Sequence, residues 1–169
     1  IIEKLNDIEI ILYNFEKLSG YRFSERCVKE LVRRFPDQVV GIKDSTYNLF
    51  EKIQIENFSV LPGSESKLLS GLNNGCSGIM TATCNVTANL SRKVYDDYFS
   101  NNIQTHNEKL CDVRKAFENF DLISGLHTFY SKEDKIYQNL LPPLRLLNNN
   151  EKKKLMDDLK DINFNFKLF

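Results

Sequence analysis

Short apolar segments alternate with amphipathic segments through the first hundred residues, and the connections between them are brief. The apolar segments have the β-branched and aromatic character of buried strands, and the segments between them carry apolar residues at helical spacing. Such alternation predicts a parallel sheet with helices packed against it. The predicted strands cover residues 8–14, 39–43, 58–61 and 76–81, and the predicted helices cover residues 24–36, 47–56, 68–73 and 85–99.

Residues after Ser100 show helical patterns only. Apolar side chains recur there at intervals of three, four and seven residues, and two further helices are expected at residues 132–141 and 150–160, separated by Pro142-Pro143. Four strand–helix units make half of a (β/α)8 barrel, which needs about 250 residues in all. The sequence therefore predicts four βα units over residues 1–100 and an α-helical extension over residues 101–169.

Composition excludes several classes of function. The 23 basic and 23 acidic residues cancel, so no net field favours nucleic acid. No signal peptide and no apolar run long enough to cross a bilayer occurs, which predicts a cytoplasmic protein without a membrane partner. The chain also starts without methionine inside an apolar pattern, which predicts that it is part of something longer.

The histidines and cysteines do not have the spacing of metal ligands, so no metal is expected. The cysteines lie among apolar or small residues and are predicted to be free, buried thiols of a reducing compartment. They are Cys27, Cys76, Cys84 and Cys111.

A lysine lies inside the most apolar of these segments, VVGIKDS. In a strand, Val39, Gly41 and Lys43 would share one face and Val40, Ile42 and Asp44 the other. An amine in the interior of a sheet or barrel is costly, because desolvation penalises its charged form, and the neutral amine that results is a usable nucleophile. The alternative is a strand-end lysine that reaches water. These seven residues leave both open.

Four motifs follow one another in a recognisable order: YNFEKLSG at residues 13–20, GIKDS at 41–45, LPGSES at 61–66 and GCSGIMTATCNV at 75–86. Together they resemble the dihydrodipicolinate synthase / N-acetylneuraminate lyase (DapA-like) family of pyruvate-dependent class I aldolases. A Leu-Pro-Pro-Leu element at residues 141–144 is similar to one in the family's C-terminal helices. Glu16 departs from the motif, which has proline at that place.

The resemblance extends over essentially the whole chain. It implies the C-terminal half of a TIM barrel, strands 5–8, followed by the helical extension. The first four strands, with the threonine-containing loop that holds the pyruvate carboxylate in the family, have no counterpart here. A four-strand half would leave open sheet edges, so we expect it to be neither stable nor active unless the other half is supplied.

The resemblance also implies roles for two side chains. Lys43 would form a Schiff base with pyruvate or another 2-keto acid, and Tyr13 would move the proton between that adduct and the second substrate. No cofactor other than this covalent adduct is expected. Tyr13 could instead be a strand-end aromatic that packs on the core with its hydroxyl in water.

Six further positions match the family's substrate pocket. Glu65 is a candidate acceptor for sugar hydroxyls, with an exposed glutamate in the first turn of a helix as the alternative. Leu18 stands where dihydrodipicolinate synthases generally have an arginine that binds a carboxylate, so it favours the lyases of sugar acids. The six positions are Leu18, Ser45, Gly63, Ser64, Glu65 and Met80.

Three functions remain open at this point. The first is an aldolase-type lyase that cleaves a 2-keto-3-deoxy sugar acid or N-acetylneuraminate to pyruvate and an aldehyde. The second is a dihydrodipicolinate synthase that condenses pyruvate with aspartate semialdehyde. The third is a non-catalytic relative that keeps the fold for ligand binding or assembly, against which the lysine and tyrosine argue. The resemblance implies a homo-oligomer, commonly a homotetramer, and leaves the aldehyde unidentified.

Overall fold

The chain divides into two compact units, Ile1–Thr81 and Ala82–Phe169. The computed structural model describes residues 2–5 and 8–165. The boundary between Thr81 and Ala82 separates two compact bodies. The predicted boundary at residue 100 separates a barrel from a helical extension, which is a different division, and it stays a prediction. The two units are taken in turn below.

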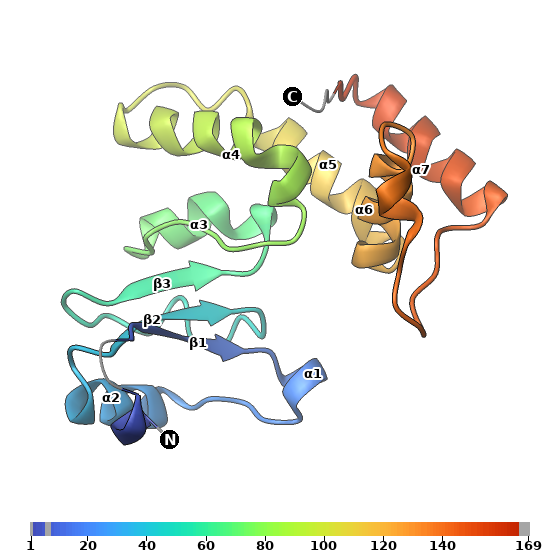
Figure 1. The fold of residues 1–169 in the computed structure, drawn as a ribbon. Coiled ribbons are helices and arrows are strands. Elements are labelled where there is room, and N and C mark those ends of the chain that lie inside the picture. The colour runs from blue at the N-terminus through green and yellow to red at the C-terminus, as the bar shows by residue number, and fades with distance from the viewer. Residues whose placement is uncertain (1, 6–7, 166–169) are drawn as a thin grey trace. The chain divides into compact units, whose positions relative to one another are not determined.

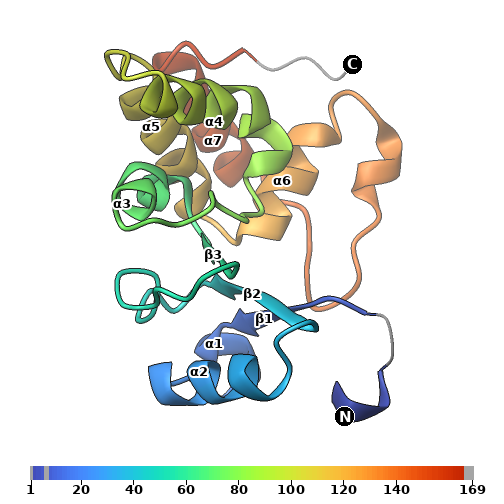
Figure 2. The same cartoon turned by 90° about the vertical axis from the view of Figure 1, so that its left-hand side faces the viewer.

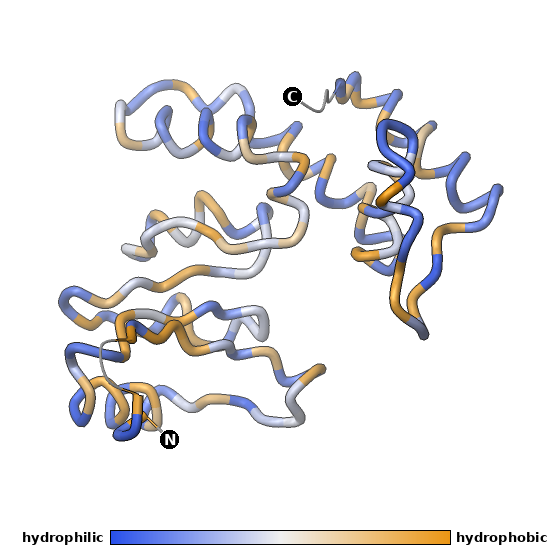
Figure 3. Tube along the Cα trace, viewed as in Figure 1, coloured by the Kyte–Doolittle hydropathy of each residue, from blue (hydrophilic) through white to orange (hydrophobic). Residues whose placement is uncertain are grey.

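A parallel sheet forms the centre of the first unit (Figure 1). Its strands are β1 (Ile10–Asn14), β2 (Val39–Asp44) and β3 (Ser59–Pro62), and they lie in that order. The first three predicted strands are therefore confirmed, with β1 starting two residues later than expected. The hydrophobic stretch along β1 in Figure 3 reflects the β-branched and aromatic residues that favour an extended chain.

The fourth predicted strand, residues 76–81, does not form. Two backbone hydrogen bonds connect this segment to β3, from Ser77 N to Val60 O at 3.1 Å and from Met80 N to Pro62 O at 3.0 Å. The donors are three residues apart and the acceptors two, which a regular parallel ladder does not allow. Gly78 lies between them with φ 148°, a conformation that side-chain-bearing residues rarely adopt. The segment follows β3 without the geometry of a strand.

Among its described residues, the first unit has three α-helices: α1 (Glu16–Ser19), α2 (Glu25–Arg34) and α3 (Leu68–Asn73). The predicted helix start at Ser24 is confirmed, because the Ser24 side chain accepts a hydrogen bond from Cys27 N at 3.2 Å. The predicted end of α3 at Asn73–Gly75 is also confirmed, and Gly75 has φ 79°.

The helix predicted over residues 47–56 is wrong. The segment is a series of turns in which Tyr47 has φ 60°. The amides of Tyr47, Leu49 and Phe50 donate to the Asp44 carboxylate, at 2.8–3.0 Å. A side chain that captures these amides offers the backbone an alternative to helical hydrogen bonds. Apolar spacing alone could not reveal that competition.

The core of the first unit lies on one face of the sheet, which we call the covered face. Val28 of α2 packs there with Leu12 and Ile42. The prediction that Val39 shares a face with Lys43 is wrong, since Val39 belongs to this same core. The register between β1 and β2 shifts between Ile10 and Ile11, where β2 carries one extra residue, and such a bulge reverses the alternation. The buried core residues are Leu12, Val28, Val39, Ile42, Leu49, Phe50, Ile53, Val60 and Cys76.

The second unit is helical. Its α-helices are α4 (Cys84–Phe99), α5 (Asn107–Glu118), α6 (Leu122–Tyr130) and α7 (Asn149–Asp161), and α5 packs against the other three (Figure 2). The predictions of α4 and α7 are confirmed within one residue at each end. The helix predicted at 132–141 is wrong, because that segment holds only a short 3-10 helix, Lys135–Gln138.

Side-chain contacts explain the ends and the core of this unit. Asn148 and Glu151 form a capping box that begins α7. Arg114 is buried and donates to Thr83 Oγ1 at 2.9 Å and to Glu118 at 2.7 Å. Within the described ranges, no helix is long and apolar enough to cross a membrane.

Candidate active site

Lys43 and Tyr13 lie side by side at the carboxyl ends of β2 and β1. They are register partners in the parallel ladder, and the Lys43 Nζ atom lies 4.4 Å from the centroid of the Tyr13 ring. Their side chains leave the sheet on the side opposite the core, which we call the open face. Tyr13 is 45% exposed and Lys43 is half-buried. The structure therefore brings the two predicted chemical groups together, on a surface that a ligand can reach.

The open face is apolar around this pair. Ile11 is 43% exposed, and Leu61 is the register partner of Lys43 on β3. Gly41 lies against β3, where an added Cβ would stand 2.7 Å from the carbonyl oxygen of Ser59. Glycine at position 41 is therefore required for the close packing of β2 against β3. It also leaves space beside the Lys43 amine.

Asp44 follows Lys43 and points to the covered face, where it is fully buried. Its carboxylate accepts a hydrogen bond from Asn14 Nδ2 at 2.7 Å, as well as the three backbone amides described above. All these partners are N–H donors, which match the acceptor oxygens of the carboxylate. Both carboxylate oxygens of Asp44 thus accept hydrogen bonds from amide N–H groups.

Asn14 extends this arrangement. Its side chain also donates to Asn48 Oδ1 at 2.8 Å and accepts from the Phe23 amide at 3.1 Å, while Asn48 donates to the Phe23 carbonyl at 3.1 Å. We call Asn14, Asp44 and Asn48 the carboxyl-end network. This network was not predicted from the sequence. A signal was available, because Asn14 follows Tyr13 and Asp44 follows Lys43, which places a polar residue on the opposite face of each apolar strand.

The loops after β2 and β3 approach each other closely. Gly63 N donates to Asp44 O at 3.0 Å, and an added Cβ on Gly63 would lie 2.3 Å from Ser45 Oγ. Ser45 N in turn donates to Asn14 O at 2.9 Å. Ser45 and Gly63, both predicted as pocket residues, are therefore in direct contact at the carboxyl edge of the sheet, where any side chain at Gly63 would displace Ser45.

Glu65 is fully buried, so the alternative of an exposed glutamate is wrong. Both of its carboxylate oxygens lie within hydrogen-bond distance of Thr81 Oγ1, at 2.9 and 3.0 Å. Ser64 is also buried, and its hydroxyl lies 3.0 Å from that of Ser66. The Glu65 carboxylate thus connects the loop after β3 to the segment that carries Met80. Its assignment as a sugar-hydroxyl acceptor stays a prediction.

Leu18 and Met80 are exposed, at 75% and 40%. Leu18 lies on the one-turn helix α1, which ends at Gly20 in the left-handed conformation with φ 67°. Glu16 begins α1, and its backbone N–H donates to Thr46 Oγ1 at 3.1 Å. Proline, the usual residue of the family motif here, has no such donor, so the departure at Glu16 has a structural use.

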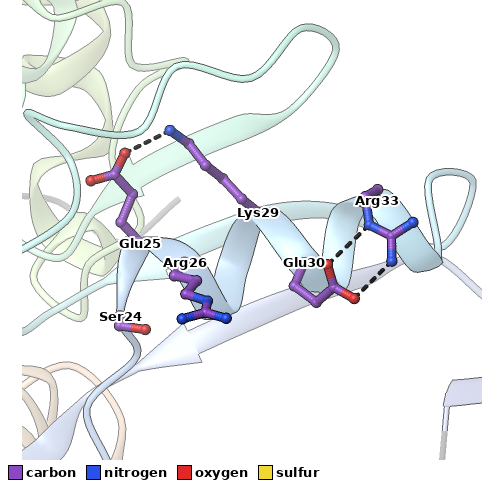
Figure 4. Close-up of a pocket in the computed structure, with 6 residues that line it drawn as sticks. All are labelled: Ser24, Glu25, Arg26, Lys29, Glu30 and Arg33. Carbon is purple, nitrogen blue, oxygen red and sulfur yellow. Dashed lines mark hydrogen bonds and ion pairs between the residues drawn. The ribbon is translucent and has the colours of Figure 1, made fainter.

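A surface hollow follows the solvent side of α2, away from these residues. Figure 4 shows its lining, which is dominated by two ion pairs within the helix. Lys29 pairs with Glu25 at 2.6 Å and Arg33 with Glu30 at 2.8 Å, and these partners hold the pKa of each glutamate below its usual range. Because α2 packs on the covered face, the hollow lies on the other side of the sheet from Lys43 and contains none of the predicted site residues.

Two further observations concern the titratable and metal-binding groups. None of the four cysteines forms a disulfide bond, but only Cys76 is buried, so the prediction of burial is wrong for the other three. Burial, with a smaller contribution from the Asp44 charge, raises the pKa of the Cys76 thiol to about 11. Across residues 2–5 and 8–165, no group of three or more His, Cys, Asp or Glu side chains is arranged to hold a metal ion.

The sequence matches the dihydrodipicolinate synthetase family over residues 1–162. The chain belongs to that family, as its motifs predicted.

Two relatives and one solved structure define the similarity further. An uncharacterized DapA-like lyase of Thermoplasma acidophilum is 24% identical over 163 residues, which are 91% of this chain and 55% of that protein. A 2-dehydro-3-deoxy-D-gluconate/2-dehydro-3-deoxy-phosphogluconate aldolase of Picrophilus torridus is 22% identical over 82% of this chain and 54% of its own length. The crystal structure of dihydrodipicolinate synthase from Thermotoga maritima superimposes with a TM-score of 0.84 at 20% identity, over 98% of this chain and 59% of that one.

The chain therefore spans little more than half the length of these two relatives. The structural match establishes a shared α/β fold over nearly all of the chain. The relatives bear the names of different enzymes, an aldolase and a synthase, so they do not fix one substrate.

Proposed function

We propose that the protein containing this chain is a Schiff-base lyase that reversibly cleaves a 2-keto-3-deoxy sugar acid, or N-acetylneuraminate, to pyruvate and an aldehyde. The observation that carries the proposal is the register pairing of Tyr13 with Lys43, which brings the phenol ring to 4.4 Å from the amine on an accessible face. A scaffold without catalysis has no need of that pair.

The reaction requires a nucleophile and a proton carrier. The Lys43 amine attacks the 2-keto carbon, and loss of water leaves an iminium ion. The iminium accepts the electron pair of the C3–C4 bond as that bond breaks, while the C4 hydroxyl gives up its proton and becomes the aldehyde. The Tyr13 phenol is the group placed to receive that proton and later return one to C3 of the enamine. Water then releases pyruvate and restores the amine.

The open face also supports placing this chain in the second half of a barrel. The strands are parallel and in sequence order, and the core helix α2 lies on the covered face. Exposed apolar side chains on the other face, such as Ile11, suit burial against further strands, as in a barrel interior. The candidate residues follow the carboxyl ends of strands, which is where active sites of such barrels lie.

Leu18 supports the choice of a sugar acid as substrate. Its exposed side chain on α1 offers no hydrogen-bond donor, so a bidentate clamp on a second carboxylate cannot form from this position. The alternative, condensation of pyruvate with aspartate semialdehyde, has the support of relatives named 4-hydroxy-tetrahydrodipicolinate synthase, such as that of Archaeoglobus fulgidus. Tests of both substrates are therefore required.

Borohydride trapping tests the chemistry directly. The full-length protein is incubated with pyruvate, reduced, digested and mapped by mass spectrometry. We expect reduced pyruvate on the peptide that contains Lys43, and its loss in Lys43→Arg but not in Lys52→Arg, an exposed lysine of the same unit. A folded protein without an adduct would overturn the Schiff-base assignment. A panel of sugar acids and aspartate semialdehyde then decides between lyase and synthase.

A further inference from the structure

We propose that the carboxyl-end network positions Lys43 and Tyr13 for reaction, with the bond between Asn14 and Asp44 as its central element. This inference rests on the proposed function for its catalytic consequence, although the geometry stands without it. Neither residue touches the open face, so both are positioning residues rather than catalytic ones.

The first step of the argument is register. Tyr13 pairs with Lys43, and the next pair along the same ladder is Asn14 with Asp44. Successive residues of a strand point to opposite faces, so the catalytic pair and the hydrogen-bonded pair lie back to back. The 2.7 Å bond between Asn14 Nδ2 and Asp44 Oδ1 therefore fixes the spacing of β1 and β2 one residue beyond the candidate amine and phenol.

The second step is that the strands need such a bond at this place. The ladder between β1 and β2 ends at Asn14 and Asp44, and a register shift already interrupts it between Ile10 and Ile11. A slip of one residue would move Lys43 to the other face of the sheet. The buried bond between Asn14 and Asp44 opposes slippage of β1 against β2 at their carboxyl ends, next to Tyr13 and Lys43.

The third step concerns the loops. Asp44 also accepts the amides of Leu49 and Phe50, while Asn14 accepts the amide of Phe23 and donates to Asn48. The same two side chains thus hold the chain segments that follow both strands. Buried, fully satisfied networks of this kind rigidify their surroundings, because any rearrangement leaves a polar group unpaired.

Three variants grade the test. Asn14→Ala removes the bond between the strands but leaves Asp44 with its backbone donors. Asp44→Asn replaces an acceptor oxygen by a donor group and so disturbs both bond and loop. Asn48→Ala removes only an outer partner. Exposed residues of the same unit supply matched controls, Asn73→Ala and Asp37→Asn.

Two readouts are made on the full-length protein, after circular dichroism has confirmed that each variant is folded. The first is the rate of borohydride trapping of pyruvate at Lys43. The second readout needs no substrate. The protein is labelled with a trace of acetic anhydride, and the ratio of label on Lys43 to label on the exposed Lys52 is measured. A residue that only stabilises the fold would leave this ratio unchanged in the folded protein.

We expect Asn14→Ala and Asp44→Asn to slow trapping about 10- to 100-fold, as displacement of a reactive group by about 1 Å does. The labelling ratio of both should differ from that of wild type, with a smaller change in Asn48→Ala and none in the controls. Folded variants that match the controls in both readouts would overturn the proposal. If Asp44→Asn does not fold, Asn14→Ala and Asn48→Ala decide. If wild type is not trapped at all, the proposed function fails, and the labelling ratio still decides whether the network positions Lys43.

Discussion

The covered and open faces of the sheet are made by alternate residues of the same strands, yet they differ in almost every property. On the covered face, Asn14 and Asp44 are fully buried and hydrogen-bonded. On the open face, Ile11 and Tyr13 are nearly half exposed, although one is wholly apolar and the other largely so. At the carboxyl end of the sheet, polar groups are thus buried beside the apolar core while apolar groups opposite them are exposed, a local reversal of the usual distribution.

This reversal shows how the two faces divide their tasks. Burial of Asn14 and Asp44 is tolerated because each polar atom named above has a partner, and that satisfaction fixes the strand ends. Exposure of Ile11 and Tyr13 is tolerated where a surface is to be covered by something else or used for binding. We therefore expect substitutions at Asn14 and Asp44 to lower stability, and to lower activity only through the position of Lys43 and Tyr13, whereas substitutions on the open face should lower activity with little change in stability.

The largest effect should follow from Lys43→Arg. Arginine stays protonated and cannot form the iminium ion, so we expect the rate at which the sugar acid is cleaved to pyruvate to fall by about 1,000-fold or more, equivalent to about 4 kcal/mol or more of transition-state stabilisation. The free energy of unfolding should change little, because Lys43 is half-buried on the open face. Steady-state kinetics and urea unfolding measure the two quantities. A large loss of stability with retained activity would show that Lys43 on the open face serves the fold rather than the reaction.

Asp44→Ala should differ from Lys43→Arg by a large loss of stability. It leaves the Asn14 amide and the backbone N–H groups of Leu49 and Phe50 buried without their acceptor. Each unsatisfied donor costs about 1–3 kcal/mol, so we expect the free energy of unfolding to fall by about 3 kcal/mol or more. Urea denaturation measures it, with the exposed Asp37→Ala as control. A change below that of the control would show that the buried carboxylate does not hold the loops.

The sequence predicted the part of this arrangement that depends on apolar pattern. Residues 8–14, 39–43 and 58–61 are short β-branched runs, and each was found near a strand. The pairing of Tyr13 with Lys43 was also within reach, because adjacent parallel strands place their carboxyl ends at one edge. These features are local or follow from strand order, so a single sequence contains them.

What the sequence could not predict depends on side-chain hydrogen bonds. The expected helix at 47–56 gave way to turns because Asp44 captures its amides, and the expected strand at 76–81 was lost at Gly78. An exposed Glu65 is one of the two alternatives from the sequence, whereas the residue is buried and hydrogen-bonded to Thr81. In each case a polar contact or a backbone angle outweighed the apolar spacing, and neither leaves a periodic signal.

Tyr13→Phe should have an intermediate effect, confined to activity. Loss of the phenol hydroxyl removes the proposed proton carrier, and general acid–base groups contribute about 100-fold or more to rate. The ring remains beside the Lys43 amine, so formation of the adduct with pyruvate should be affected less than cleavage of the complete substrate. Separate measurement of borohydride trapping and of turnover distinguishes the two steps. Equal losses in both would assign Tyr13 to positioning of the amine instead.

Cys76 gives a pH-dependent test on the covered face. Because its pKa is raised to about 11 in the folded chain, the neutral thiol stabilises the fold fully below about pH 9, and this contribution is lost as the pH rises toward 11. We expect wild type to lose about 1 kcal/mol relative to Cys76→Ala between pH 8 and 10. Unfolding curves at both pH values measure the difference. A difference that stays the same at both pH values would contradict the prediction.

The smallest effect concerns Glu16, at the loop that follows Tyr13. Glu16→Pro removes the N–H that donates to Thr46 Oγ1, a net loss of about 0.5–1 kcal/mol, but proline suits the first position of a helix and lowers the entropy of the unfolded chain by a similar amount. We expect the free energy of unfolding to stay within about 0.5 kcal/mol of Glu16→Ala, which keeps the N–H. In a Thr46→Val background the acceptor is already absent, so the same proline substitution should stabilise the chain. If proline destabilises equally in both backgrounds, the bond to Thr46 does not explain why this chain has glutamate where the family motif has proline.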